Sequence, residues 1–177
     1  MTAEELAGLV CQTLREAGIT VTLSGGACVA LWSCGKYVSQ DLDFIEEGPV
    51  PRRRVVEAMK TLGFQPEGRY FVHADTQLFV EFPTGPLMVG DERVERVSIR
   101  NTPGGELRLL SPTDCVKDRL AAYFHWNDRQ ALEQAVLVAS AQKIDLNDVR
   151  RWSDAEGSAP KFQVFKKRLS IPKLFGS

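Results

Sequence analysis

Apolar and polar positions divide the chain into an α/β part followed by a helical part. Leu6, Val10 and Leu14 recur at helical spacing before Gly18, which is typical of a helix C-terminus, and shorter apolar runs typical of strands follow. The pattern predicts helices over residues 4–17, 27–33 and 51–62, strands over 19–24, 41–45, 69–73, 77–82, 94–99 and 107–110, and a loop over 83–90. The runs at 69–73 and 77–82 are expected to pair as a hairpin.

A helix start at Ser111 marks the change of character. Ser111 suits the N-cap position, Pro112 the first helical position and Asp114 the capping-box position. Further starts are expected at 127–128 and 145, and residues 161–177 form either a docked amphipathic helix or a mobile basic arm. We therefore predict an α/β (α+β) fold, with a mixed sheet and flanking helices over 1–110 and a helical extension over 111–177 that packs on this core.

Two aspartates in the predicted strand 41–45 provide the strongest chemical signal. Asp41 and Asp43 are two residues apart, so a strand directs both carboxylates to the same face. Like charges this close repel each other unless a cation lies between them, and Mg²⁺ or Mn²⁺ with oxygen ligands is the usual solution. The alternative is an acid pair beside a turn with no function, but Leu42 and Phe44 favour a buried strand.

A glycine pair precedes these aspartates. Gly25-Gly26 separates the strand 19–24 from the helix 27–33, and glycine lets the backbone turn sharply and approach a ligand closely. The N–H groups at the start of a helix bind anions. A phosphate cradle that faces a metal site indicates nucleotide chemistry.

Glu81 is a candidate third acid. It lies in Leu78-Phe79-Val80-Glu81-Phe82, a run that is otherwise apolar. A charged group in such a strand is rarely tolerated unless it is paired or binds a metal. The alternative is an edge strand on which Glu81 faces water.

Composition narrows the class of protein. The 177 residues are 44% hydrophobic and carry a net charge of −1, which does not indicate a general nucleic-acid binder. Basic clusters at 52–54, 150–151 and 166–168 are either solvated faces or polyanion patches. The four cysteines contain no Cys-x-x-Cys pair, which indicates reduced thiols. The histidines and cysteines do not have the spacing of a zinc site, so we do not expect zinc. We find no signal peptide and no apolar run of membrane-spanning length, so we expect a cytoplasmic protein without a membrane partner.

The glycine and aspartate segments together resemble a known family. Leu23-Ser24-Gly25-Gly26-Ala27, followed by Ser39-Gln40-Asp41-Leu42-Asp43, is similar to the signature of the nucleotidyltransferase superfamily. Within that superfamily the chain most resembles the AbiEii/AbiGii-type toxin group, in which a serine commonly stands shortly before the aspartate pair. The segment from Leu110 to Arg129 resembles the helical motifs of that group more weakly. The resemblance covers roughly residues 20–135.

The resemblance implies a metal-dependent transfer of NMP from an NTP to a hydroxyl of RNA, protein or a small molecule, with release of pyrophosphate. It also implies a toxin whose partner is an antitoxin protein. It places metal ions on Asp41, Asp43 and Glu81, with Glu81 also helping to deprotonate the hydroxyl. The residues implied to contact the nucleotide are Ser24, Gly25, Gly26, Ser39, Lys117, Arg119 and Asp128.

The chain departs from the family pattern at three positions. Tyr37 stands where a basic residue is common, Arg119 replaces the lysine of the first tail helix, and Asn127 replaces the lysine of a Lys-Asp pair. The departures at Tyr37 and Asn127 are the main support for the alternative function, which is a catalytically inactive nucleotide-binding or protein-interaction module with the same fold.

Overall fold

A computed structural model describes residues 1–171 and confirms the predicted mixed α/β architecture. Residues 172–177, the end of the predicted segment 161–177, lie outside the described residues. The first part of the chain forms, in order, α1 (Ala3–Glu16), β1 (Val21–Ser24), α2 (Gly25–Trp32), β2 (Asp41–Glu46), α3 (Arg52–Thr61), β3 (Gln65–Glu67), β4 (Tyr70–Val72), β5 (Phe79–Glu81), β6 (Met88–Val89), β7 (Glu92–Arg93), β8 (Val97–Thr102) and β9 (Gly105–Leu110).

The main sheet has seven strands in the order β3-β4-β5-β2-β1-β9-β8. Strand β1 runs antiparallel to β2 and parallel to β9, and β2 runs parallel to β5. The predicted hairpin is present as the antiparallel pair β4–β5. The central strands of this sheet are therefore β1, which leads directly into the glycine pair, and β2 and β5, which carry the three predicted acids.

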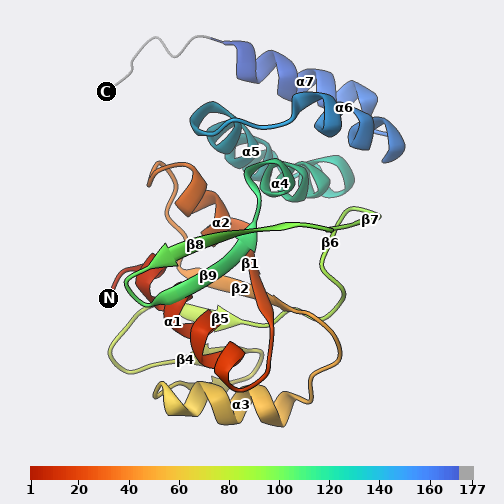
Figure 1. Ribbon diagram of the computed structural model, residues 1–177. Coiled ribbons are helices and arrows are strands. Elements are labelled where there is room, and N and C mark those ends of the chain that lie inside the picture. Colours follow the sequence, from red (N-terminus) through yellow and green to blue (C-terminus); the bar gives the residue numbers. More distant parts are fainter. Residues whose placement is uncertain (172–177) are drawn as a thin grey trace.

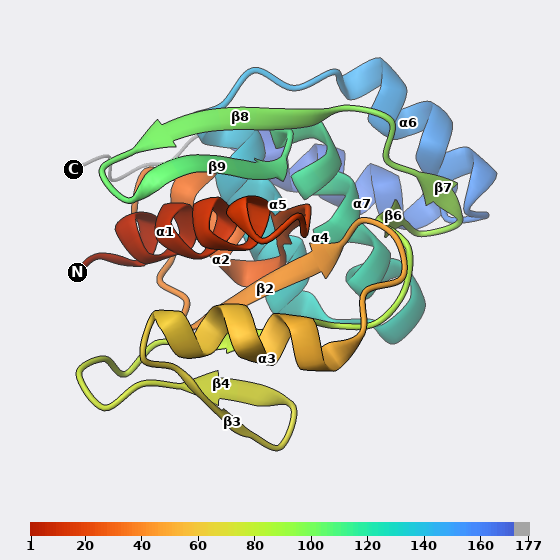
Figure 2. The same ribbon diagram turned by 60° about the horizontal axis from the view of Figure 1, so that its bottom comes forward.

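In strands β2 and β5, one face is apolar and packs in the core, and the other face holds the acids. Leu42 and Phe44 are fully buried on the apolar face. Helix α3 lies over the same face, as the position of its first residue shows: the Arg52 guanidinium stands 4.7 Å from the centre of the Phe71 ring. Figure 2 shows α1 beside α3 in front of the sheet. Because side chains alternate along a strand, Asp41 and Asp43 point to the opposite face.

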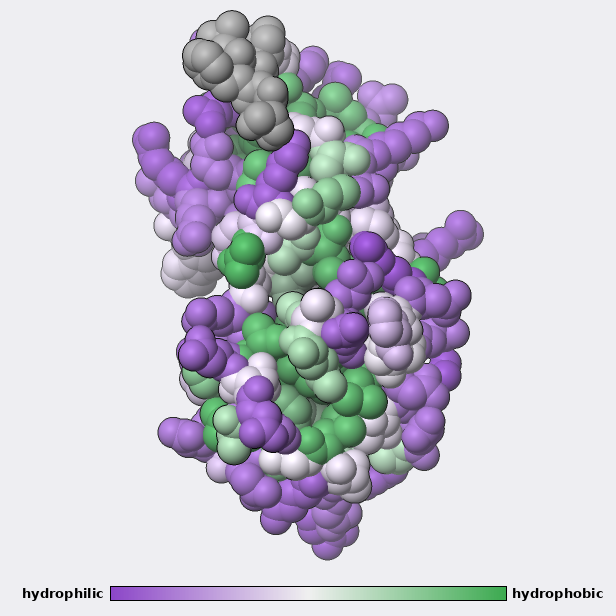
Figure 3. Space-filling view, turned by 90° about the vertical axis from the view of Figure 1, so that its left-hand side faces the viewer, coloured by the Kyte–Doolittle hydropathy of each residue, from purple (hydrophilic) through white to green (hydrophobic). Residues whose placement is uncertain are grey.

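The rest of the chain is helical, as predicted. It forms α4 (Pro112–Trp126), α5 (Arg129–Ala141), α6 (Leu146–Ala155) and α7 (Ala159–Ser170), which lie together above the sheet in Figure 1. The Trp32 indole N–H donates to the Leu110 carbonyl at 2.8 Å, and the Gln142 amide donates to the Trp32 carbonyl at 2.9 Å. Helix α2 thus joins the two parts. Figure 3 shows a narrower waist between them, with apolar side chains on both sides of it.

Some boundaries differ from those predicted. Strand β3 was not predicted, because its sequence Gln65-Pro66-Glu67 is exposed and contains proline. The short hairpin β6–β7 begins inside the predicted loop 83–90. Helix α2 starts at Gly25, two residues early, and α3 starts at Arg52 with Pro51 as its N-cap. Within the described residues, no helix is both long and apolar enough to span a membrane.

Candidate active site

A single row of side chains crosses four strands on the face opposite the core. Ser24 pairs with Asp43, Asp43 pairs with Glu81, and Glu81 pairs with Tyr70, so all four side chains project from one face. Asp41 lies on the same face, two residues before Asp43. The structure therefore brings the three predicted acids and Ser24 together on adjacent strands, about 4.8 Å apart from strand to strand.

Gly25 places the start of α2 directly against Asp43. Its φ is +64°, in the left-handed region that favours glycine. A Cβ at this position would lie 2.5 Å from Asp43 Oδ2, so only glycine leaves room for the carboxylate. Ser24 is the N-cap of α2 but makes no side-chain capping bond, and its hydroxyl donates to the Asp43 carbonyl at 3.4 Å.

Gly26 faces the loop that leads into β2. A Cβ on Gly26 would lie 3.1 Å from Ser39 Oγ and 3.3 Å from Tyr37 Cε1. The Ser39 hydroxyl donates to the Asp41 carbonyl at 3.0 Å and accepts from the Asp41 N–H at 3.3 Å. Ser39 therefore shapes the backbone before the aspartate pair and lies beside the glycine turn.

The pKa of Asp43 reports the crowding of negative charge. Burial, together with the charges of Glu81 and Asp41, raises its pKa to about 6, while Arg119 acts in the opposite direction. The shift agrees with the repulsion expected between closely spaced carboxylates, and Asp43 is the centre of the cluster.

The acids do not form a preformed three-ligand metal centre. Across residues 1–171, no three Asp, Glu, His or Cys side chains are arranged to hold a metal ion. Glu81 is instead paired with Arg69, whose Nε lies 3.4 Å from Glu81 Oε1. Asp41 and Asp43 still offer two adjacent oxygen ligands. This donor set suits Mg²⁺, which commonly binds one or two carboxylates and completes its coordination with substrate phosphates and water.

Arg119 is the cation that the helical part directs toward the acids. It lies on α4, and its charge acts on Asp43. Its Nε and Nη2 donate to Asp118 at 3.0 and 2.6 Å, and its Nη1 donates to Gln134 at 3.4 Å. Asp118 and Gln134 therefore fix the orientation of the guanidinium beside the site.

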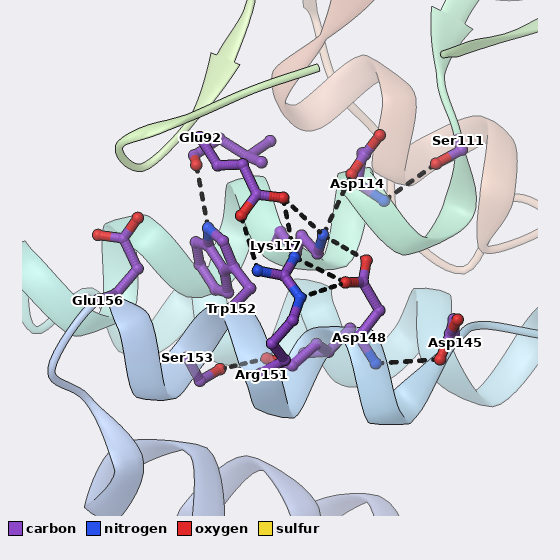
Figure 4. A network of polar contacts seen from close by, with 12 residues as sticks. Glu92, Ser111, Asp114, Lys117, Asp145, Asp148, Arg151, Trp152, Ser153 and Glu156 are labelled. Carbon is purple, nitrogen blue, oxygen red and sulfur yellow. Dashed lines mark hydrogen bonds and ion pairs between the residues drawn. The ribbon is translucent and has the colours of Figure 1, made fainter. Parts of the chain in front are cut away.

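Lys117 is placed elsewhere. Its side chain is only 3% exposed, and its ammonium lies 2.6 Å from Asp148, 3.7 Å from Asp114 and 3.8 Å from Glu92. Arg151 bridges Glu92 and Asp148 as well, as Figure 4 shows. These five residues, here called the Lys117 network, join α4, α6 and the β6–β7 hairpin.

Asp128 serves as a helix cap. Its side chain accepts a hydrogen bond from the Ala131 N–H at 3.0 Å and so begins α5, after Asn127 in the left-handed conformation. The structure does not bring Asp128 or Lys117 into the acid row. The nucleotide contacts predicted for these two residues have no geometric support in this arrangement.

Three residues next to the acids were missed in the sequence. Arg69 pairs with Glu81, Tyr70 is the register partner of Glu81, and Phe79 is the register partner of Asp41. The position of Phe79 could have been inferred, because it stands two residues before Glu81 in one strand. Arg69 and Tyr70 could be placed beside the acids only once it was known that β4 pairs with β5 in this register.

Comparison with known proteins supports the fold. No family model matches the chain, and no curated protein matches it. A crystal structure of an antigenic nucleotidyltransferase-like protein from Paracoccidioides brasiliensis is 13% identical, covers 90% of this chain and 92% of its own, and has a TM-score of 0.52.

Two structures of ANT(2″)-Ia are also similar in outline. The solution structure of this antibiotic-resistance factor is 13% identical, covers 90% of both chains and has a TM-score of 0.48. The complex with adenylyl-2″-tobramycin is 14% identical, covers 92% of this chain and 95% of the other, and has a TM-score of 0.46. The similarity in fold rests on the Paracoccidioides brasiliensis structure and on the topology described above. The chain has the nucleotidyltransferase-like fold.

Proposed function

We propose that this protein is a nucleotidyltransferase that transfers NMP from an NTP to a hydroxyl group and releases pyrophosphate. The observation that carries the proposal is the row Ser24–Asp43–Glu81, with Gly25 packed against the Asp43 carboxylate at the start of α2. In this proposal the backbone N–H groups at Gly25 and Gly26 bind the triphosphate, and Arg119 offsets its negative charge.

The proposed role of the acids depends on a divalent ion. Asp41 and Asp43 would hold Mg²⁺ or Mn²⁺, which supplies charge stabilisation for the attacking and leaving oxygens when bound. Glu81 lies next to Asp43 in the row and is 19% exposed, so its carboxylate can accept the proton of an incoming hydroxyl. Before the hydroxyl arrives, Glu81 is paired with Arg69.

A narrower assignment rests on the sequence. The chain resembles the AbiEii/AbiGii-type toxins in having a serine, Ser39, before the aspartate pair. This resemblance supports a toxin role with an antitoxin as partner. Ser39 lies against Gly26 and bonds to the Asp41 backbone, so we assign Ser39 a structural role in shaping the turn next to the proposed phosphate site.

A second function is an inactive binding module with the same fold. Two observations favour it: the ion pair between Glu81 and Arg69, and the absence of a three-carboxylate metal group within residues 1–171. Against it stands the placement of three carboxylates side by side in one row, where burial and the charges of Glu81 and Asp41 raise the pKa of Asp43, as is common at catalytic sites.

Transfer of label from α-³²P-labelled NTPs separates the two functions. Each of the four NTPs is incubated with Mg²⁺ or Mn²⁺ and with RNA, protein or small hydroxyl compounds as acceptors. We expect incorporation by the wild type and none above background by Asp43→Asn. Asp154→Asn, an exposed acid on α6, is the matched control and should behave as the wild type. NTP binding without incorporation under every condition would favour the inactive module.

A further inference from the structure

Two aromatic rings, the half-buried Tyr70 and the exposed Phe79, flank the acids on the same face. Tyr70 is the register partner of Glu81, and Phe79 is the register partner of Asp41, so both rings project beside the carboxylates. Their centroids are 5.9 Å apart with a tilt of 49°, and Phe79 is 37% exposed. An aromatic pair on a charged face offers a surface on which a flat ring can stack.

Arg69 adds a cation to the same surface. Its guanidinium stands 4.8 Å from the centre of the Tyr70 ring and donates to the Tyr70 hydroxyl at 2.5 Å. The side chain remains 70% exposed although it is paired with Glu81. An exposed guanidinium can bind a phosphate with two parallel hydrogen bonds while it stays against the ring.

The in-line geometry of the proposed reaction puts this surface on the side from which the acceptor approaches. In an in-line displacement, the attacking oxygen and the leaving group lie on opposite sides of the phosphorus. In the proposed function the leaving pyrophosphate lies at Gly25 and Gly26, next to β1. The acceptor must then approach from the β5 and β4 side, where Glu81 comes first and Tyr70 follows in the row.

We propose that Arg69, Tyr70 and Phe79, here called the acceptor platform, bind a nucleoside phosphate as the acceptor. The inference rests on the proposed function and names its acceptor class. The base stacks on Phe79 and Tyr70, the phosphate binds Arg69, and a ribose hydroxyl reaches Glu81. Aromatic stacking accepts any base, because every base has a flat π face.

The transfer step is balanced without any further reactant. The ribose oxygen of the acceptor forms a bond to the α-phosphorus of the NTP, and the bond from that phosphorus to the bridging oxygen of the β-phosphate breaks. Pyrophosphate leaves with the electron pair of that bond. The hydroxyl proton goes to the Glu81 carboxylate, which becomes available when the acceptor phosphate draws Arg69 away.

The charge of the platform distinguishes between classes of acceptor. Arg69 offers hydrogen-bond donors to a phosphate, whereas the neighbouring carboxylates would favour polycationic sugars and polyamines, so both kinds of acceptor are compared. A free mononucleotide and the end of an RNA strand share the chemistry of base, ribose and phosphate. The experiment therefore includes both as separate arms.

Binding is measured first and without NTP. A fluorescein-labelled short single-stranded RNA is followed by anisotropy, and AMP by calorimetry, with wild type, Phe79→Ala, Phe79→Trp and Arg69→Gln. We expect Phe79→Ala and Arg69→Gln each to weaken binding about tenfold, and Phe79→Trp to retain it. Arg53→Gln, an exposed arginine on α3, is the control and should bind as the wild type. Tighter binding of RNA than of AMP identifies a strand end as the source, and the reverse identifies the free nucleotide.

Kinetics then separate this inference from the proposed function. In the transfer assay, Phe79→Ala should raise KM for the acceptor about tenfold and leave KM for the NTP unchanged. Three outcomes would overturn the acceptor platform. The first is equal binding by all variants, the second is an equal rise in both KM values, and the third is labelling confined to a polycationic sugar or a protein. If no NTP is turned over, the proposed function fails, and the binding measurements still decide whether the platform recognises nucleotides.

Discussion

Asp43 is the residue on which the chemistry of this protein converges. It is half-buried beside Gly25, lies between Ser24 and Glu81 in register, and is affected by the charge of Arg119 on α4. The same-face spacing with Asp41 could be predicted from two letters of sequence. The contact with Gly25 could not, because it depends on how closely α2 begins after β1.

The raised pKa of Asp43 predicts how stability depends on pH in the metal-free protein. The folded carboxyl, with a pKa of about 6, holds its proton more tightly than the unfolded one, whose pKa is near 3.8. The contribution of Asp43 to stability therefore falls as pH rises from about 4 to about 6 and then levels off. The Asp43→Asn variant does not lose this stability as pH rises, because its amide cannot ionise.

Thermal unfolding in EDTA between pH 4 and pH 7 measures this effect. The melting temperature of Asp43→Asn relative to the wild type should increase across that interval. Asp154→Asn should show no such trend, because this exposed acid on α6 lies outside the cluster. A difference between Asp43→Asn and wild type that stays constant with pH would mean that Asp43 titrates normally.

Gly25 and Gly35 provide a matched pair for testing the phosphate turn. Both have positive φ, +64° and +78°, but a Cβ on Gly25 would strike Asp43 whereas a Cβ on Gly35 would meet nothing within 4 Å. Replacing either by Ala should lower stability by about 1 kcal/mol through backbone strain, and Gly25→Ala should lower it further because the Asp43 carboxylate must move. Only Gly25→Ala should also lose NTP binding in calorimetry. Equal loss of affinity in both variants would show that the turn acts through strain alone.

The helices and hairpins were predictable to different degrees. Helices with an apolar stripe and clear caps, such as α1 and α4, match their predicted positions closely. The β6–β7 hairpin was missed because only two residues of each strand pair, and its position is fixed from outside by the Lys117 network and by the Trp152 indole, which donates to the Val89 carbonyl at 3.0 Å. Tertiary contacts hold this hairpin, and its own sequence gives little sign of them.

The two basic residues of α4 should therefore behave differently when replaced. Lys117→Met removes a buried ammonium from three carboxylates and should lower the free energy of unfolding by about 2 kcal/mol in urea titration, without changing NTP affinity in the folded protein. Arg119→Met should instead weaken NTP binding. The exposed pair of Arg168 with Glu133 gives the control, since Arg168→Gln should alter stability by less than about 1 kcal/mol. Loss of NTP affinity in Lys117→Met would instead support the nucleotide contact predicted for Lys117 from the sequence.

The overall order of an α/β part followed by helices could be predicted because the period of apolar residues changes after Leu110. The way in which the two parts meet could not. Trp32 and Gln142 join α2 to α5 through hydrogen bonds, and α4 delivers Arg119 to the acid row. These contacts bring together residues that are far apart in sequence, and no local pattern encodes them.

Because of these contacts, ligand binding at the acid row should stabilise both parts of the molecule together. Trp32 lies on α2, whereas Trp126 and Trp152 lie in the helical part, so fluorescence of Trp32→Phe reports only the helical part. Mg²⁺ with NTP at about 100 times its Kd should add about 2.7 kcal/mol of stability, and the gain should exceed that from Mg²⁺ alone because the phosphates complete the coordination of the metal.

This gain corresponds to a rise of about 5–10 °C in melting temperature for a chain of this length. Circular dichroism of the whole chain and fluorescence of Trp32→Phe should show the same rise, and Asp43→Asn should abolish it in both. A rise in circular dichroism without one in fluorescence would show that the helical part unfolds independently of the site. An identical response of wild type and Asp43→Asn would remove the proposed metal site and leave the binding module as the better description, because the ligand would then stabilise the fold without using the carboxylate at the centre of the row.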